Sequence, residues 1–167
     1  NQESANTIFF SEFDEFESCP EINSLTIQNN NQVNDAITGL VPFGSVLLVM
    51  QRSHSHQLTF NTDPNKDAAV ALVANRGLLN QQCYDIYENT LYGLDERGVY
   101  AMSQNGEVRS LSEPIADFFI EGKIEFAYTE SFYVKIDPKS RTLRAFVIEP
   151  HGNTGYSPTA QDGYTNK

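Results

Sequence analysis

Short apolar segments of strand length, each bounded by turn residues, follow one another along most of the chain. The continuous apolar run 46–50 predicts a central strand that is covered on both faces. Residues 84–87 alternate in polarity, which predicts a strand with one buried face. Asn105 and Gly106 form the strongest short hairpin signal. The repeated alternation of strand-length segments with turn residues predicts an all-β, antiparallel fold.

Other segments extend the same interpretation. Strands are also expected at 8–13, 25–27, 91–94, 99–102, 108–111, 124–128, 132–136 and 143–148. Gly39, Pro42 and Gly44 are expected to break 37–45 into a strand, a turn and the start of a second strand.

A short helix is expected near 114–120. Ser112 is positioned to cap it, and Pro114 falls in its first turn. Segment 68–72 is open to two interpretations, because its alanines favour a helix and its valines favour a strand.

A weak internal repeat groups these strands. Residues 43–52 align with 87–96 at an offset of 44 and with 128–137 at a further offset of 41. A repeat of this length is the size of one four-stranded propeller blade. Residues 1–150 are therefore predicted to form about three antiparallel blades of a β-propeller, and 151–167 a polar tail or linker. A ring of roughly four to eight blades needs more chain, so the blades are expected to belong to a larger ring. A longer polypeptide is the favoured source of the missing blades, and neighbouring chains are the alternative.

The charge balance restricts the partners. The chain has 22 acidic and 11 basic residues, a net charge of −11, which argues against general binding to nucleic acid or anionic membranes. Lys135, Lys139, Arg141 and Arg144 form a local basic spot, for which a solvated strand–turn–strand is the preferred interpretation.

Targeting and redox signals are few. No run approaches the ~18 apolar residues of a membrane-spanning helix, and the start has no signal-peptide pattern. The first residue is Asn1, so the chain is expected to be processed, trimmed or part of something longer. Cys19 and Cys83 lie 64 residues apart, and two free thiols are expected rather than a disulfide.

Several segments match one family in order. Residues 37–52 read ITGLVPFGSVLLVMQR, 91–100 read LYGLDERGVY, and 112–119 read SEPIADFF. Together with 10–20 and 77–80, they resemble propeller-type structural proteins of bacteriophage tails and necks, in the tail-nozzle and packaged-DNA stabilisation group. The resemblance covers residues 8–148. The chain departs from the family pattern at 52–56, where a polar segment replaces a hydrophobic strand, so that strand is expected to be an edge or an interface.

The resemblance implies a virion structural protein of a phage tail or head–tail junction, made in the host cytoplasm. It implies no shared catalytic motif and no cofactor, and therefore no enzyme. The implied partners are other tail or neck proteins and copies of the chain in a homo-oligomeric ring. An acidic channel would let DNA pass without specific binding, although ordinary solubility is the preferred explanation of the acidity.

Two histidines have a spacing that is typical of metal ligands. His54 and His56 have a spacing that can place both imidazoles on one strand face, with Asp63 or Glu12 as a third ligand. Two exposed histidines are the preferred interpretation, so no metal site is predicted. The Asp/Asn-rich stretch 61–67 lacks the pattern of a strong calcium site. A metal- or calcium-stabilised binding domain remains a third hypothesis.

Carboxylates cluster at 14–17 and at 95–96, and paired carboxylates can hydrolyse glycans. A glycan-binding or glycan-depolymerising tail module is therefore the alternative function, with aromatic side chains stacking on sugars. Solvated acidic loops are the preferred interpretation, and no catalytic residue is assigned. Candidate partner contacts lie in 13–20, 52–57 and 151–167. They are Phe13, Phe16, Arg52, His54, His56 and Tyr156.

Overall fold

The structure is a computed structural model that describes residues 5–12, 14–27, 35–59, 68–120 and 123–149. These residues are mostly β, and all strand pairs among them are antiparallel, which confirms the expected class. The strands are β1 (Thr7–Phe9), β2 (Ser24–Thr26), β3 (Ile37–Phe43), β4 (Val46–Gln51), β5 (Ser55–Thr59), β6 (Ala69–Ala74), β7 (Tyr84–Tyr87), β8 (Thr90–Asp95), β9 (Gly98–Ser103), β10 (Val108–Ser110), β11 (Tyr133–Asp137) and β12 (Thr142–Phe146).

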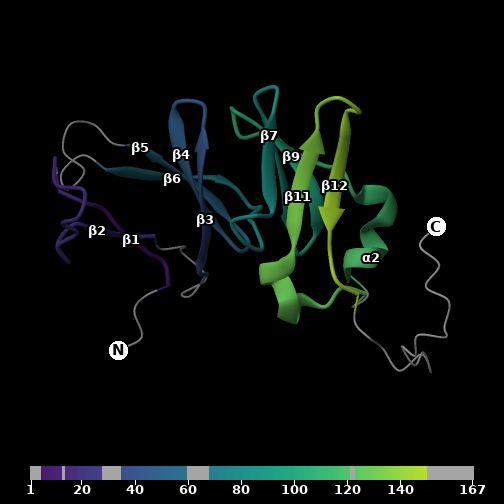
Figure 1. Cartoon of the computed structure of the whole chain (residues 1–167), viewed down its shortest axis with the longest axis horizontal. Coiled ribbons are helices and arrows are strands. Elements are labelled where there is room, and N and C mark those ends of the chain that lie inside the picture. Colours follow the sequence, from purple (N-terminus) through teal and green to yellow (C-terminus); the bar gives the residue numbers. More distant parts are fainter. Residues whose placement is uncertain (1–4, 13, 28–34, 60–67, 121–122, 150–167) are drawn as a thin grey trace.

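The described strands form four sheets in chain order. A β1–β2 pair comes first, followed by two four-stranded meanders, β3–β4–β5–β6 and β7–β8–β9–β10, and a β11–β12 pair. Figure 1 shows these sheets side by side, with β1–β2 at one end and β11–β12 at the other. The described part of the chain is thus an open series of sheets.

The central strands of each four-stranded sheet are covered on both faces. The main core fills the space between the two meanders and β11–β12, and includes Met50, Leu91 and Phe132. A smaller core packs β1–β2 on the opposite face of the first meander, around Val49 and Leu58. Leu48 and Met50 of β4 face the main core while Val49 faces the smaller one, so the prediction of a strand covered on both faces is confirmed.

The repeat at offset 44 is confirmed. The β3–β4 turn follows Phe43 and the β7–β8 turn follows Tyr87, so both meanders start with the same hairpin. The third copy is misplaced, because Tyr128 lies in the 3-10 helix η2 (Phe126–Ser131). The strand predicted at 124–128 is therefore wrong. Glu125 accepts a hydrogen bond from the backbone N of Ala127, which starts helical turns there instead.

The predicted break inside 37–45 is also wrong. β3 continues through Gly39 and Pro42, and the turn comes only at Gly44, which has a φ of +63°. Proline lacks an N–H and is tolerated because β3 is an edge strand that pairs with β4 alone in its sheet. A register shift between Ile37 and Gly39 bends its start.

The polar segment 52–57 does not form an edge. It makes a turn and then enters β5, which pairs with both β4 and β6, and Ser55 and His56 are buried. The expectation of an edge or interface strand is wrong, because β5 is a central strand of its sheet and its polar side chains Ser55 and His56 lie under cover on the sheet faces. The open segment 68–72 belongs to strand β6.

One short helix lies where it was expected. It consists of the 3-10 turn η1 (Glu113–Ile115) and α2 (Ala116–Ile120). Ser112 is the N-cap residue, but its side chain makes no capping hydrogen bond. Its Oγ instead accepts from the backbone N of Val99 at 3.1 Å, which ties the helix start to β9.

The connection between the meanders holds three sheets together. Leu78 N donates to the carbonyl of Gln51 in the first meander, and Leu79 N donates to that of Leu94 in the second. The Gln81 amide pairs with both backbone groups of Leu40 on β3, at 2.8 and 3.0 Å. The backbone N of Val134 in β11 donates to Gln82 O at 3.0 Å. The sheets therefore have a defined relative placement.

Candidate functional site

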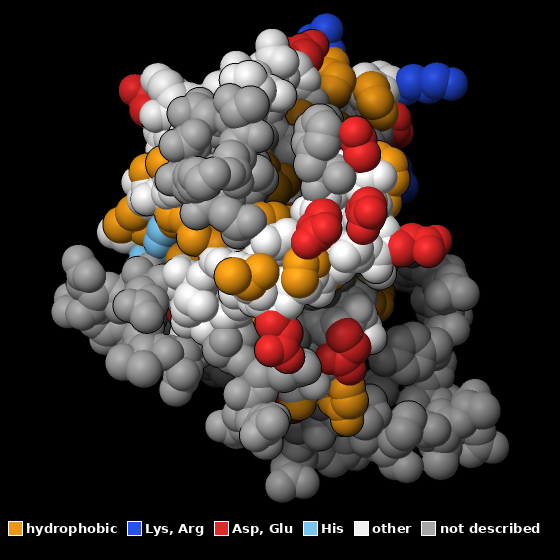
Figure 2. Space-filling view, turned by 90° about the vertical axis from the view of Figure 1, so that its left-hand side faces the viewer, with side chains coloured by type: hydrophobic (Ala, Val, Ile, Leu, Met, Phe, Trp, Pro, Cys, Tyr) orange, Lys and Arg blue, Asp and Glu red, His pale blue; other side chains and the backbone are white. Residues whose placement is uncertain are grey.

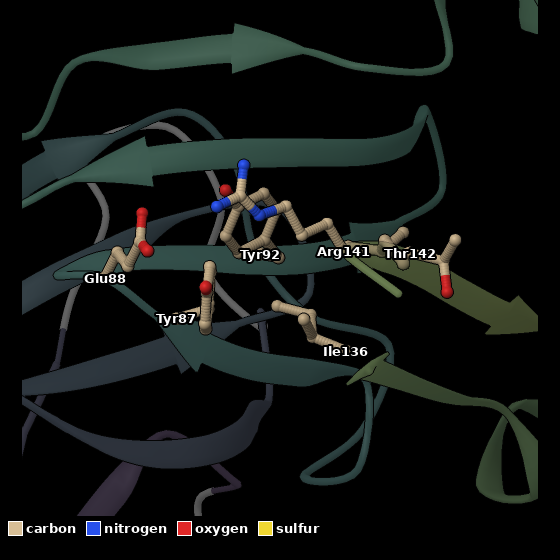
Figure 3. Close-up of a pocket in the computed structure, with 7 residues that line it drawn as sticks. Tyr87, Glu88, Tyr92, Ile136, Arg141 and Thr142 are labelled. Atoms are coloured by element: carbon tan, nitrogen blue, oxygen red, sulfur yellow. The ribbon is translucent and has the colours of Figure 1, made fainter. Parts of the chain in front are cut away.

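A pocket of about 230 Å³ opens between the β7–β8 turn and the β11–β12 hairpin (Figure 3). Its lining residues are Tyr87, Glu88, Tyr92, Ile136, Arg141, Thr142 and Leu143. Two tight turns form its rim, since Glu88 and Arg141 have φ values of +47° and +52°. No sequence signal marked this pocket, because its two sides are about fifty residues apart in the chain.

The pocket combines aromatic rings with one residue of each charge. Tyr87 hydrogen bonds to the carboxylate of Glu88, and this contact raises the pKa of Tyr87. Figure 3 shows the Arg141 side chain reaching across toward Tyr92. Such a site can stack a flat ring and hydrogen bond to it. Glu88 is the single acid among the described lining residues, so the pair of carboxylates that glycan hydrolysis needs is not brought together here.

Asp35 organises the turn between β4 and β5. Its carboxylate accepts from the backbone N of Arg52 and of Ser53, both at 3.1 Å, and from Ser53 Oγ at 2.6 Å. His54 Nδ1 lies 2.7 Å from Ser53 Oγ and 3.3 Å from Asp35 Oδ2. In a catalytic triad the serine and the aspartate contact opposite nitrogens of the ring. Here both contact Nδ1, so the cluster is a turn cap.

The two histidine candidates have different environments. His54 lies in the turn against Asp35, whereas His56 is buried in β5 and only 4% exposed. Burial lowers the pKa of His56, and the neighbouring His54 lowers it further while Asp35 opposes them. Within the described residues, no three His, Cys, Asp or Glu side chains come together as metal ligands. Asp63 lies outside those residues.

The two acidic clusters differ as well. Asp95 is buried and paired with Arg76 at 2.7 Å, while Glu96 pairs with Arg52 at 2.5 Å. Neither carboxylate is among the described residues that line the pocket between β7–β8 and β11–β12. The loop 14–17 is a compact exposed turn in which Asp14 has a φ of +61° and Glu12 bridges to Glu15. Neither cluster places two carboxylates across a substrate pocket.

The buried ion pair is the polar centre that sequence reasoning missed. Arg76 contacts Asp95, donates to the carbonyl of Gly98 at 3.0 Å and lies 4.7 Å over the Tyr100 ring. Burial raises the pKa of Asp95 and lowers that of Arg76, although each opposes the shift of the other. The Tyr100 hydroxyl donates to the carbonyl of Gly77 at 2.8 Å. These contacts join the second meander to the connection that precedes it.

The partner-contact candidates are spread over the molecule. Phe16 is 86% exposed at the β1–β2 end, and Arg52 bridges the meanders through Glu96. Phe13 and Tyr156 lie outside the described residues, as does segment 151–167. Exposed apolar side chains that sequence reasoning did not single out include Ile22, Leu72, Tyr133 and Phe146.

Both cysteines are free, as expected. Cys19 is exposed and Cys83 is buried, and burial raises the pKa of Cys83 to about 11. Among the described residues, no helix is long and apolar enough to cross a membrane. No family model matches the sequence. No curated protein matches it either.

Proposed function

We propose that this chain is a non-enzymatic structural module that acts by assembly with neighbouring units, as blades of a propeller-like ring. The observation that carries the proposal is the difference between the middle and the ends of the sheet series. The central strands of both meanders, β4, β5, β8 and β9, are mostly buried, whereas the two outer ends expose large apolar side chains, including Phe16 and Phe146. Exposed apolar surface of this kind marks interaction sites.

The proposed setting is a phage tail or head–tail junction, and its support is the resemblance over residues 8–148. The matching segments fall on consecutive elements, with 37–52 on β3 and β4 and 91–100 on β8 and β9. In a propeller the blades surround a central channel, and we propose the first strands of the sheets, β3, β7 and β11, as the ones nearest to it. With a net charge of −11, the module would repel DNA and let it slide.

Native mass measurement and electron microscopy test the structural role. The expected result is a discrete assembly of more than one chain, seen as a ring or tube with a central channel, and no retention of duplex DNA at 150 mM salt. A chain that stays monomeric over the whole concentration range, without any ring, would overturn the proposal.

A second candidate function is glycan binding, which the Tyr87–Tyr92–Arg141 pocket favours. Its tyrosine rings and single guanidinium suit recognition of a sugar ring. Titration with a panel of bacterial surface oligosaccharides, followed by NMR, tests it. Binding that Tyr92→Ala abolishes would support the function, whereas unchanged spectra throughout the panel would exclude it.

A further inference from the structure

The described strands divide into groups of two, four, four and two along the chain. Each meander is a complete four-stranded unit, while the first and last units have half that number. Among described strands, β1 and β2 pair only with each other, and so do β11 and β12. A two-stranded sheet can be extended by further strands at its edges.

The two half-sheets cover different parts of their neighbours. β11 lies against β7 and β8, the first two strands of the second meander. β1–β2 packs on Val49 and Leu58 of the first meander, which lie on β4 and β5. The β11–β12 pair thus lies where the first two strands of the next blade would lie. The β1–β2 pair lies over the middle strands of the first meander.

The first meander has an uncovered area beside β1–β2. Val41 and Phe43 of β3 point into the main core, so Leu40 and Pro42 point to the opposite face. Both are exposed, with Leu40 at 37%. On the second meander, the corresponding area over its first two strands is covered by β11–β12.

The outer face of the β11–β12 hairpin has the matching composition. Tyr133 and Phe146 are cross-strand partners, and their rings stack at 5.3 Å while remaining 40% and 46% exposed. Lys135 lies directly opposite Arg144 on the same face. Two like charges in this position are unfavourable within a hairpin. Asp85 of β7 lies 4.0 Å from the Lys135 ammonium and offsets part of this repulsion, and a partner that brings further negative charge would relieve the rest.

The opposite end of the molecule supplies that charge. Residues 12–21 contain five acidic and no basic residues, while the hairpin residues 133–146 contain four basic and one acidic residue. Figure 2 looks onto the β1–β2 end and shows Asp and Glu side chains beside exposed hydrophobic ones. Figure 1 places this end and the β11–β12 hairpin at opposite sides. One chain therefore carries two complementary ends that face away from each other.

We propose that β11–β12 of one copy and β1–β2 of a second copy join edge to edge into one four-stranded sheet, so that copies assemble head to tail. This inference rests on the proposed structural function and names its partner surfaces. Contacts of this heterologous kind close into a ring or continue as a filament. Two copies closed in this way hold six complete sheets, within the roughly four to eight blades of known propellers.

A charge-swap experiment on the full chain tests the proposal. The hairpin variant carries Lys135→Glu and Arg144→Glu, and the end variant carries Glu15→Lys and Glu17→Lys. We expect each variant alone to associate at least about tenfold more weakly than the unchanged chain in sedimentation at low salt. An equimolar mixture of the two should regain association, because each contact then joins opposite charges.

The control carries Arg109→Glu, at an exposed position on β10, and is matched to Lys135→Glu alone, because each change replaces one basic residue with one acidic residue. Its association should equal that of the unchanged chain. Thermal unfolding of every variant reports fold stability, and the hairpin variant keeps a like-charge pair across its strands. Association that both swaps leave unchanged, or that mixing does not restore, would overturn the proposal.

Two further variants separate the possible occupants of the hairpin face. Phe146→Ser should weaken association, whereas Ile115→Ser, at a 57% exposed position on η1, should not. If removal of residues 150–167 abolishes association, this segment and not the hairpin face makes the contact, and the proposal is overturned. If the chain forms assemblies that ignore all these changes, the structural function stands and only these surfaces fail. If it never assembles, both fail.

Discussion

The two meanders share one topology, but they fill equivalent positions of their sheets with different residues. In the first, Val49 of β4 lies opposite His56 of β5; in the second, Gly93 of β8 lies opposite Tyr100 of β9. Both pairs are 44 residues apart in the repeat. A Cβ on Gly93 would come within 2.6 Å of the Tyr100 ring, so the glycine leaves room for the tyrosine. One position thus loses volume where its partner gains it, which is how a repeat preserves packing while its sequence diverges.

The polar group of this pair also differs between the meanders. The Tyr100 hydroxyl donates to the Gly77 carbonyl, whereas His56 Nδ1 has no hydrogen-bond partner among the described residues. The second meander surrounds its tyrosine with the Arg76–Asp95 pair. We therefore expect the second meander to depend on buried polar contacts more strongly than the first.

The largest expected effect comes from Arg76→Ala. It removes the nearer of two cations from the Asp95 carboxylate, whose side chain is 2% exposed, and leaves it the more distant Arg97 guanidinium at 3.7 Å; the free energy of unfolding should fall by about 3–5 kcal/mol. Urea unfolding measures this loss. Arg52→Ala is the matched control, because the exposed Arg52–Glu96 pair should contribute less than about 1 kcal/mol. Equal losses in both variants would contradict the contrast between buried and exposed pairs.

The Gly93→Val substitution copies the first meander into the second. We expect it to destabilise the protein by about 1–3 kcal/mol, since the new side chain overlaps the Tyr100 ring. Adding Tyr100→His completes the copied pair and should recover part of the packing loss, in a double-mutant cycle of urea unfolding energies. A purely additive cycle would show that the two positions do not exchange volume.

Removing one hydroxyl tests the hydrogen bond from Tyr100 to the Gly77 carbonyl alone. Tyr100→Phe leaves the Gly77 carbonyl without its donor and should cost about 1–2 kcal/mol in urea unfolding. The ring and its contact with Arg76 remain. Tyr128→Phe, at a 54% exposed position, should change the unfolding energy by less than about 0.5 kcal/mol. A Tyr100→Phe variant as stable as the unchanged chain would show that this hydrogen bond does not stabilise the second meander.

The smallest effect is a pH dependence from the first meander. Burial lowers the pKa of His56 below its ordinary value of 6.5, so only the unfolded chain takes up its proton as pH begins to fall. Stability from this group is therefore complete above pH 6.5 and declines below it, by at most about 1.4 kcal/mol per pH unit. His56→Gln should remove this part of the slope between pH 6.5 and 5. An unchanged slope would mean that other groups cause it.

Much of the fold could be predicted because strand signals are local. The apolar run in β4, the turn residues Glu88 and Asn89, and the Gly98 turn with a φ of +111° all lie where periodicity and turn chemistry placed them. The errors came from context. From the sequence, Pro42 is interpreted as a strand breaker, yet the edge position of β3 tolerates it. The polar β5 is a central strand, and its side chains Ser55 and His56 are buried on the sheet faces.

The candidate sites were less predictable. The Tyr87–Arg141 pocket and the Arg76–Asp95 pair join residues that are far apart in the chain, and no spacing rule connects them. His54 and His56 have a metal-like spacing, but one lies in a turn against Asp35 and the other is buried in a strand. Spacing specifies a shared face only when both residues belong to the same strand.

The amino-acid sequence by itself determined the antiparallel strands, most of their turns and the repeat of 44 residues, because backbone preferences and alternating polarity act between near neighbours. The tertiary structure alone decided which strand became an edge, which charge was buried and which faces stayed open. Those outcomes depend on burial, and burial is set by sheets that meet across long stretches of chain.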